Sequence, residues 1–317
     1  MNKQKANRNQ AAVGTEKKDV YQVITARIIE QLQKGVVPWQ KSWNTIQPQN
    51  LVSKRPYRGF NRLLLSCLGF ESSYFLTIQQ VNQLGGRVRK GEKGIPVVYY
   101  KSSYKLADGS FSDGSGLTAE QKQGLEKSSL LKYYFVFNVS QCEGIDGHVP
   151  SPSSPEMTES VDGFHICDMI LDSYPNGPIV QQADSMEPCY FPQMDVVQMP
   201  NPTLFSSPHH YYMTLFHELV HSTGHSSRLA RPEVTSRSVR FGDPEYSREE
   251  LVAEIGACFL SNHAGILNEE VFQSNASYLK SWISKLQEDP KLIVFAASAA
   301  QKATEYILNT QQDALAA

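Results

Sequence analysis

The sequence predicts an α+β protein of two domains, a small α+β domain followed by a mostly helical domain with a small sheet. Its 317 residues exceed the usual length of a single domain. Charge also divides the chain, because residues 1–145 hold 21 Lys and Arg against 10 Asp and Glu, whereas residues 146–317 hold 9 against 22. We therefore expect a disordered leader, a first domain, a proline- and serine-rich linker and a second domain, at residues 1–18, 19–145, 146–160 and 161–317.

Helical and strand patterns alternate through the first domain. Apolar residues at three- and four-residue spacing predict helices at residues 20–34, around 63–68 and, behind the cap Thr77, at 78–84. Runs rich in Val, Ile, Tyr and Phe predict strands at residues 95–101 and 133–140. The polar stretch between those strands is expected to form a long connection with one helical turn. The first domain should therefore contain a small antiparallel sheet.

The charge of the first domain favours a polyanion as its partner, and all eight histidines lie at or beyond residue 148. Two tryptophans within five residues, followed by aromatic residues interleaved with arginine, are typical of a site for single-stranded nucleic acid, where aromatic faces stack on bases and cations meet phosphates. A basic turn before the strand at 95–101 predicts a phosphate clamp. The predicted contacts to single-stranded DNA are Trp39, Trp43, Tyr57, Arg58, Asn61, Arg87, Arg89, Lys90 and Lys93. The alternatives are tryptophans that fill the domain core and a basic face that is merely solvated.

The second domain contains an H-E-x-x-H pattern inside a predicted helix. Ser207 can cap this helix, Pro208 suits its first turn, and Gly224 is a natural end. His217 and His221 lie four residues apart, so both imidazoles leave the same helical face and can bind one Zn²⁺. Glu218 lies next to the first histidine and is the predicted catalytic general base. The pattern is short and also occurs by chance, so its context decides its meaning.

A second helical run at residues 248–260 can supply the third protein ligand that a mononuclear zinc site needs. Glu250 and Glu254 lie four apart on one face of this run, and either carboxylate satisfies the spacing. Ala253, Gly256 and Ala257 are small enough to let the two helices approach closely. We predict Glu250 as the ligand, with Glu254 as the alternative.

Several other segments complete the second domain. We expect strands within residues 189–200, leading to the histidine helix, and further helices at 165–173, 269–285 and 290–308. A long loop between the two metal helices can shape the site. His225 and Tyr246 are weaker candidates for an extra ligand or a proton donor. An edge strand beside the metal helix would bind an extended peptide by backbone pairing.

Five scattered cysteines without a C-x-x-C pattern predict reduced thiols in a cytoplasmic protein. The polar N-terminus does not resemble a signal peptide, and no apolar run reaches the length of a membrane span. We therefore expect no membrane partner and no secreted protease.

Taken together, these motifs resemble the ArdC-type antirestriction proteins of conjugative plasmids. The resemblance rests on Pro38-Trp39, residues 57–61, the basic turn at 86–96, the strand at 135–138, residues 216–225 and residues 250–254. It implies a single-stranded DNA-binding domain joined to a zincin-like metallopeptidase domain, which together protect incoming plasmid DNA from restriction. The cofactor would be Zn²⁺ or another divalent ion such as Mn²⁺, and a protein or peptide would be the substrate.

The second helical run also resembles that of gluzincin metallopeptidases. In that class a glutamate ligand precedes a second acidic residue by four positions, and the second residue orients a ligand histidine. The resemblance implies that Glu250 binds the metal and that Glu254 belongs to the second shell.

Two rival functions remain open on the sequence. In the first, the metal site is structural or vestigial, and the protein acts only by coating single-stranded DNA. In the second, the protein is a metal-dependent nuclease, but one His₂Glu site on an acidic domain lacks the clustered carboxylates and two ions that phosphodiester cleavage usually requires. The nature of residue 218 separates the first rival from a peptidase, since a structural site has no need of a carboxylate there.

Overall fold

The computed structural model describes residues 19–40, 47–150, 162–183, 187–235, 244–267 and 276–310. Trp43, the expected leader and most of the expected linker lie outside these residues. The predicted fold class is confirmed, because a mixed sheet with helices is followed by a mostly helical region with a small sheet. None of the helices in the described part of the chain is long and apolar enough to cross a membrane.

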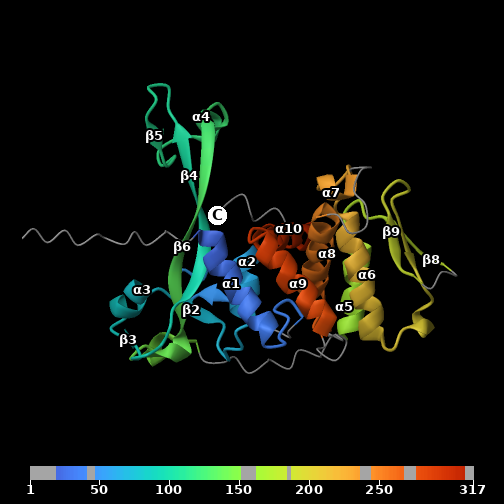
Figure 1. Ribbon diagram of the computed structural model, residues 1–317, viewed down its shortest axis with the longest axis horizontal. Coiled ribbons are helices and arrows are strands. Elements are labelled where there is room, and N and C mark those ends of the chain that lie inside the picture. The colour runs from blue at the N-terminus through green and yellow to red at the C-terminus, as the bar shows by residue number, and fades with distance from the viewer. Residues whose placement is uncertain are drawn as a thin grey trace, which may run out of the picture.

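The first half is built on a five-stranded sheet in the order β1-β2-β6-β4-β5. Its strands are β1 (Gln49–Asn50), β2 (Tyr74–Leu76), β4 (Ile95–Lys105), β5 (Phe111–Ser112) and β6 (Glu126–Asn138). The helices of this half are α1 (Val20–Gln33), α2 (Gly59–Ser66), α3 (Ile78–Gln83) and α4 (Ala119–Gln123). A separate two-stranded sheet pairs β3 (Arg87–Val88) with β7 (Cys142–Glu143). The long antiparallel pair of β4 and β6 projects away from the helices, with α4 and β5 near its tip (Figure 1).

The two long strands extend further than the sequence pattern predicts. The expected strands at 95–101 and 133–140 pair without interruption from Ile95↔Val136 to Lys105↔Glu126. Serines and lysines at residues 102–105 and 126–129 have weak strand preference of their own, so the cross-strand ladder holds them in place. The expected long connection is correspondingly shorter and contains α4 and β5.

The second half is mostly helical, with a three-stranded sheet in the order β8-β10-β9. Its helices are α5 (Gly163–Ser173), α6 (Pro208–Ser222), α7 (Pro232–Thr235), α8 (Pro244–His263), α9 (Ala276–Glu288) and α10 (Leu292–Ile307). Its strands are β8 (Ile179–Gln182), β9 (Cys189–Phe191) and β10 (Val196–Met199). Strand β10 is central, with β9 antiparallel on one side and β8 parallel on the other, so β9 lies at one edge of the sheet.

The two halves share one hydrophobic core. Buried side chains of α1 and α2 belong to the same cluster as those of α6, α8 and α10, and α1 and α2 lie beside α9 and α10 (Figure 1). Gly59 opens α2 with a φ of +52°, and a Cβ there would lie 3.5 Å from the Cα of Ser298 on α10. The Thr25 hydroxyl donates to the carbonyl of Pro290 at 2.6 Å. The halves are therefore joined by packing as well as by the chain that connects them.

Candidate metal centre

Helix α6 presents its histidines on one side because its other side is fixed in the core. The Ser207 hydroxyl accepts the His210 amide hydrogen at 3.2 Å and so caps the helix, with Pro208 in the first turn. Met213, Leu215, Phe216, Leu219 and Val220 are buried. His217 and His221 therefore leave the helix on the face that meets α8.

Helix α8 lies close enough to complete the cluster because it carries small residues at the crossing. A Cβ at Gly256 would lie 2.7 Å from a methyl carbon of Val220, so only glycine allows this approach without a shift. The close crossing places three carboxylates of α8, those of Glu249, Glu250 and Glu254, around the two histidines.

The three side chains predicted as metal ligands lie together. The Nε2 atoms of His217 and His221 are 3.0 Å apart, and the Glu250 carboxylate lies 3.6 Å from each of them. One ligand atom from each residue falls within 4.8 Å of the others. Two imidazole nitrogens and one carboxylate oxygen are a donor set that suits Zn²⁺ and leaves a coordination position open. The residues present therefore fit a catalytic type of metal site.

The pKa values of Glu250 and His217 are shifted in opposite directions. Burial would raise the pKa of the Glu250 carboxyl, but His217 and His221 outweigh burial and lower it to about 2. Burial would lower the pKa of His217, but Glu250 and Glu218 raise it above its ordinary value. His217 and Glu250 thus stabilise each other's charged forms, and a divalent cation bound beside them would take the place of the proton on His217.

Glu249 is a site residue that the sequence analysis missed. His221 Nδ1 donates to Glu249 Oε1 at 3.1 Å, and Arg231 donates two further hydrogen bonds to the same carboxylate. Burial favours protonation of Glu249, yet Arg231 and His221 hold the pKa of this carboxyl below its ordinary value. A proton fixed on Nδ1 leaves the Nε2 lone pair of His221 directed at the cluster.

The sequence contained a partial signal for this residue. Three carboxylates stand on one predicted helix, and Arg231 lies in the loop before it. Which carboxylate faces His221 depends on the rotation of α8 about its axis, and helical spacing alone does not fix that rotation.

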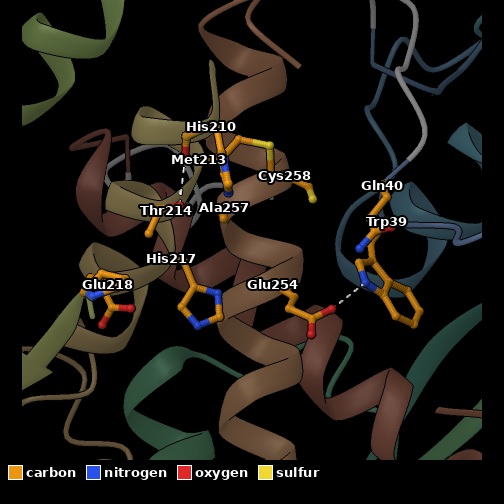
Figure 2. A pocket seen from close by; sticks show the side chains of 11 residues that line it. Trp39, Gln40, His210, Met213, Thr214, His217, Glu218, Glu254, Ala257 and Cys258 are labelled. Carbon is orange, nitrogen blue, oxygen red and sulfur yellow. Dashed lines mark hydrogen bonds between the residues drawn. The ribbon is translucent and has the colours of Figure 1, made fainter. Parts of the chain in front are cut away.

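Glu254 occupies a different position from the one predicted by resemblance. Its carboxylate accepts hydrogen bonds from the Trp39 indole at 2.9 Å and from the Tyr278 hydroxyl. Figure 2 shows Glu254 directed at Trp39, with the His217 ring on the opposite side of the carboxylate. Burial raises the pKa of Glu254. The carboxylate that orients a ligand histidine through a hydrogen bond is thus Glu249, while Glu254 links the cluster to the first half of the chain.

Glu218 is held between the cluster and the edge strand β9. Its side chain is nearly buried and accepts the Tyr190 amide hydrogen at 2.8 Å. Two adjoining hollows of about 360 and 420 Å³ share Pro188, His217 and Glu218 in their walls. The site therefore lies in the middle of a cleft whose one wall is a sheet edge.

The two weaker candidates have different positions. Tyr246 lines the larger hollow, where burial and its hydrogen bond to Glu250 raise its pKa to about 12, so that it remains a proton donor at neutral pH. The His225 ring instead interacts with the hydroxyl and amide of Ser227. His225 is not among the side chains that gather at the cluster in the described part of the chain.

Several residues predicted to bind DNA serve packing instead. Trp39 has no exposed surface and meets Trp282 in a T-shaped contact, and Tyr57 is buried against Phe75. Asn61 donates to the Val98 carbonyl and accepts the Val98 amide hydrogen, both at 2.8 Å, so it caps the open edge of β4. The expectation that these three side chains contact DNA does not fit their positions. Residues of α9 and β2 pack on Trp39 and Tyr57, and the backbone of β4 occupies the side-chain amide of Asn61.

The predicted cations have mixed surroundings. Arg58 forms an ion pair with Glu305 of α10, Arg87 pairs with Glu143, and Arg89 pairs with Glu92. Lys90 and Lys93 are exposed on the same turn. The basic turn is thus at the surface, where its phosphate-binding role stays a prediction.

Two family models match consecutive parts of the chain. A model described as "N-terminal domain of anti-restriction factor ArdC" matches residues 18–137, and one described as "Zincin-like metallopeptidase" matches residues 176–299. The chain is 33% identical over 306 residues to a protein named "DNA primase TraC" from Escherichia coli, with 93% of this chain and 20% of the primase aligned. It is 30% identical over 308 residues to "Uncharacterized protein y4eC" of Sinorhizobium fredii (strain NBRC 101917 / NGR234), with 93% and 94% aligned. The chain thus spans about a fifth of the primase but nearly all of the second relative.

Solved structures give the same result in three dimensions. The metal-free crystal structure of the antirestriction ArdC protein from R388 plasmid is similar with a TM-score of 0.66 and 33% identity, covering 92% of this chain and 97% of that one. The Mn(II)-bound structure of that protein gives a TM-score of 0.68 and 32% identity, covering 93% and 99%.

Proposed function

Because the chain belongs to the ArdC-type antirestriction family, we propose that it protects incoming plasmid DNA from restriction in the cytoplasm of the host. In this proposal the first half binds single-stranded DNA, and the second half cleaves a protein or peptide at a divalent metal. The observation that carries the peptidase part is the cluster of His217, His221 and Glu250 with the Glu218 carboxylate beside it. The free state of the described cysteines agrees with a reducing compartment.

The proposed ligands are His217, His221 and Glu250, and Zn²⁺ is the proposed cofactor. When bound, such an ion polarises the scissile carbonyl and makes a water molecule more acidic. Glu218 takes a proton from the attacking water and returns it to the leaving amine. Glu249 keeps the proton of His221 on Nδ1, and Tyr246 stands as a donor to the oxygen of the substrate carbonyl.

The position of β9 supports a peptide as the substrate. This strand lies at the edge of its sheet and passes directly beside Glu218, whose carboxylate holds the Tyr190 amide. An extended peptide can pair with the backbone of such an edge while its side chains enter the hollows on either side. A phosphodiester substrate would gain nothing from this backbone edge, and the surrounding acidic side chains would repel it.

A noncatalytic alternative is favoured by one observation. The cluster lies where α6 crosses α8, within the core that both halves share, so a metal there would stabilise the fold whether or not it reacts. In that case DNA protection would come from binding single-stranded DNA alone.

Replacing Glu218 by Gln separates the two functions. We expect Glu218→Gln to keep its metal and its melting temperature but to lose antirestriction activity in a conjugation assay with a restricting recipient. Asp172→Asn, at an exposed position of α5, provides the control for the same carboxylate-to-amide change. If Glu218→Gln protects DNA as well as the wild type, the noncatalytic alternative is correct.

A further inference from the structure

The hairpin of β4 and β6 exposes an unusual number of large apolar side chains. Most exposed residues of this kind in the described part of the first half lie on these strands or at the tip between them, namely Tyr99, Tyr100, Phe111, Leu130, Tyr133, Tyr134 and Phe135. The outer part of the hairpin projects away from the shared core (Figure 1), while Ile95, Val97 and Val136 at its base belong to that core. The large apolar side chains named above are each at least 38% exposed, so they do not fill it. Exposed aromatic residues on a projecting ribbon indicate a binding surface.

The strand register assigns these residues to two opposite faces. Residues directly across from each other in an antiparallel pair lie on the same face, and Tyr99 lies across from Lys132, Lys101 from Leu130, and Val97 from Tyr134. The first face therefore carries Tyr99, Tyr134, Lys101, Lys132 and Leu130. The ring centroids of Tyr99 and Tyr134 are 5.8 Å apart, so the two rings form a continuous aromatic surface.

The second face does not bring its exposed aromatic rings close to a lysine of these strands. Tyr100, Tyr133 and Phe135 lie on it, and Tyr133 meets Phe135 in a T-shaped contact. The lysine of β4 or β6 on this face is Lys127, opposite Tyr104. It stands six positions from Tyr133, or about 20 Å along a strand. The exposed rings of the second face thus lie far from the lysine of that face, whereas on the first face the exposed ring of Tyr99 lies directly opposite Lys132.

We propose that single-stranded DNA binds across the first face of the hairpin, with bases stacked on Tyr99 and Tyr134 and phosphates held by Lys101 and Lys132. This proposal rests on the proposed function of the first half and supplies a surface for it. Single-stranded DNA offers unpaired base faces to aromatic rings and phosphates to cations, which is the chemistry of this face. A duplex hides its base faces within the stack, so the surface should prefer single strands.

Neither the stacking residues predicted from the sequence nor a second copy of the chain as occupant fits as well. The predicted stacking residues Trp39 and Tyr57 are buried, so the aromatic faces that a base can reach lie on the hairpin instead. In a symmetric dimer through the first face, Lys101 and Lys132 would lie within an interface formed by two copies of the same basic surface, which is repulsive.

Fluorescence anisotropy of the full chain with a labelled thirty-residue oligothymidylate tests the proposal. We expect the double variant Tyr99→Ala/Tyr134→Ala to bind about thirtyfold more weakly or worse, as the loss of two stacked bases requires. The variant Lys101→Ala/Lys132→Ala should weaken binding and reduce its salt dependence. Tyr99→Trp/Tyr134→Trp retains aromatic faces and should bind like the wild type.

The opposite face offers a closely matched control. Tyr100 and Tyr133 adjoin the test residues in sequence, and their exposed fractions of 50% and 38% match the 44% of Tyr99 and 38% of Tyr134. Tyr100→Ala/Tyr133→Ala should bind within about twofold of the wild type. Melting temperatures of all variants identify any loss that comes from misfolding.

Four results would overturn the proposal. If only the control pair weakens binding, the second face is the surface; if neither pair does, DNA binds elsewhere and the proposed function of the first half survives. If the wild type itself does not bind the oligonucleotide, the DNA-binding part of the proposed function fails too. If Tyr99→Ala/Tyr134→Ala changes a dimer into a monomer with unchanged DNA affinity, the occupant is a second copy of the chain.

Discussion

The metal cleft and the β4–β6 hairpin use polar and aromatic side chains in opposite ways. In the cleft each charged group is held by neighbours, as Glu249 is by Arg231 and His221, and Glu218 by the amide of Tyr190. On the hairpin Tyr99 and Lys101 stand in solvent on a two-stranded ribbon. A site that performs chemistry needs fixed geometry, whereas a surface that stacks bases needs accessible faces. Removing a side chain that holds another charged group of the cleft should therefore lower stability or metal content, whereas the isosteric change Glu218→Gln should not. Substitutions on the hairpin should change binding alone.

The largest expected effect comes from removing a proposed metal ligand. His217→Ala should purify without metal and show a melting temperature that does not respond to a chelator, because an ion held by the proposed ligands would connect α6 and α8, which pack against each other. Metal analysis and thermal unfolding with and without EDTA measure both. His225→Ala is the control, since His225 interacts with Ser227 outside the cluster. A His217→Ala protein that purifies with stoichiometric metal would contradict the ligand assignment.

The next largest effect is expected for the buried ion pair of Arg231 and Glu249, whose carboxylate accepts the Nδ1 proton of His221. Arg231→Met retains an unbranched apolar stem but removes the two guanidinium donors to Glu249, so the free energy of unfolding should fall by about 3–5 kcal/mol. Metal affinity should also fall about tenfold or more, since Glu249 orients His221.

Denaturant unfolding and metal titration measure these two losses. The control Arg27→Met removes a half-exposed pair with Glu30 and should cost under about 1 kcal/mol. Equal costs for the two arginine variants would show that the cleft is not held more tightly than the surface.

A substitution of Trp39 tests whether this residue supports the cleft by packing or binds DNA by stacking. Trp39→Phe preserves most of the ring but removes the donor to the buried Glu254, which should lower the free energy of unfolding by about 1.5–3 kcal/mol. Single-stranded DNA affinity should not change, because the ring has no exposed surface. The opposite pattern, with unchanged stability and weaker DNA binding, would restore the stacking role that the sequence predicted.

The two sites also differ in how far the sequence could predict them. His217, Glu218 and His221 lie on one helical turn, so local spacing brings them together, and the small residues of α8 indicated its close approach. The contact between Trp39 and Glu254 joins residues 215 positions apart, and no local pattern contains that information. A sequence pattern of aromatic residues interleaved with arginines is compatible both with stacking on bases and with filling a core. The packing of α9 and α10 against α1 and α2 decides between these roles for Trp39, and it is a property of the whole chain.

The smallest effect on stability, and a separate test of the DNA surface, comes from the basic turn. Lys90 and Lys93 are exposed, so Lys90→Ala/Lys93→Ala should change the free energy of unfolding by less than about 0.5 kcal/mol. If both lysines meet phosphates, the slope of log affinity against log salt should fall by about 1.4, at roughly 0.7 for each contact to a single strand. The loss should be equal for oligonucleotides of different sequence, because phosphate contacts carry no base information.

Arg87→Ala is the matched control for this turn, because its charge already pairs with Glu143 and contributes less to a DNA contact. An unchanged slope in the lysine variant, together with a reduced slope in Lys101→Ala/Lys132→Ala, would confine the DNA path to the hairpin. Reduced slopes in both would extend the path from the hairpin to its base, since Lys93 lies two residues before β4 begins. The comparison of these two lysine pairs thus measures how far the DNA-binding surface extends from the hairpin toward the packed base of the first half.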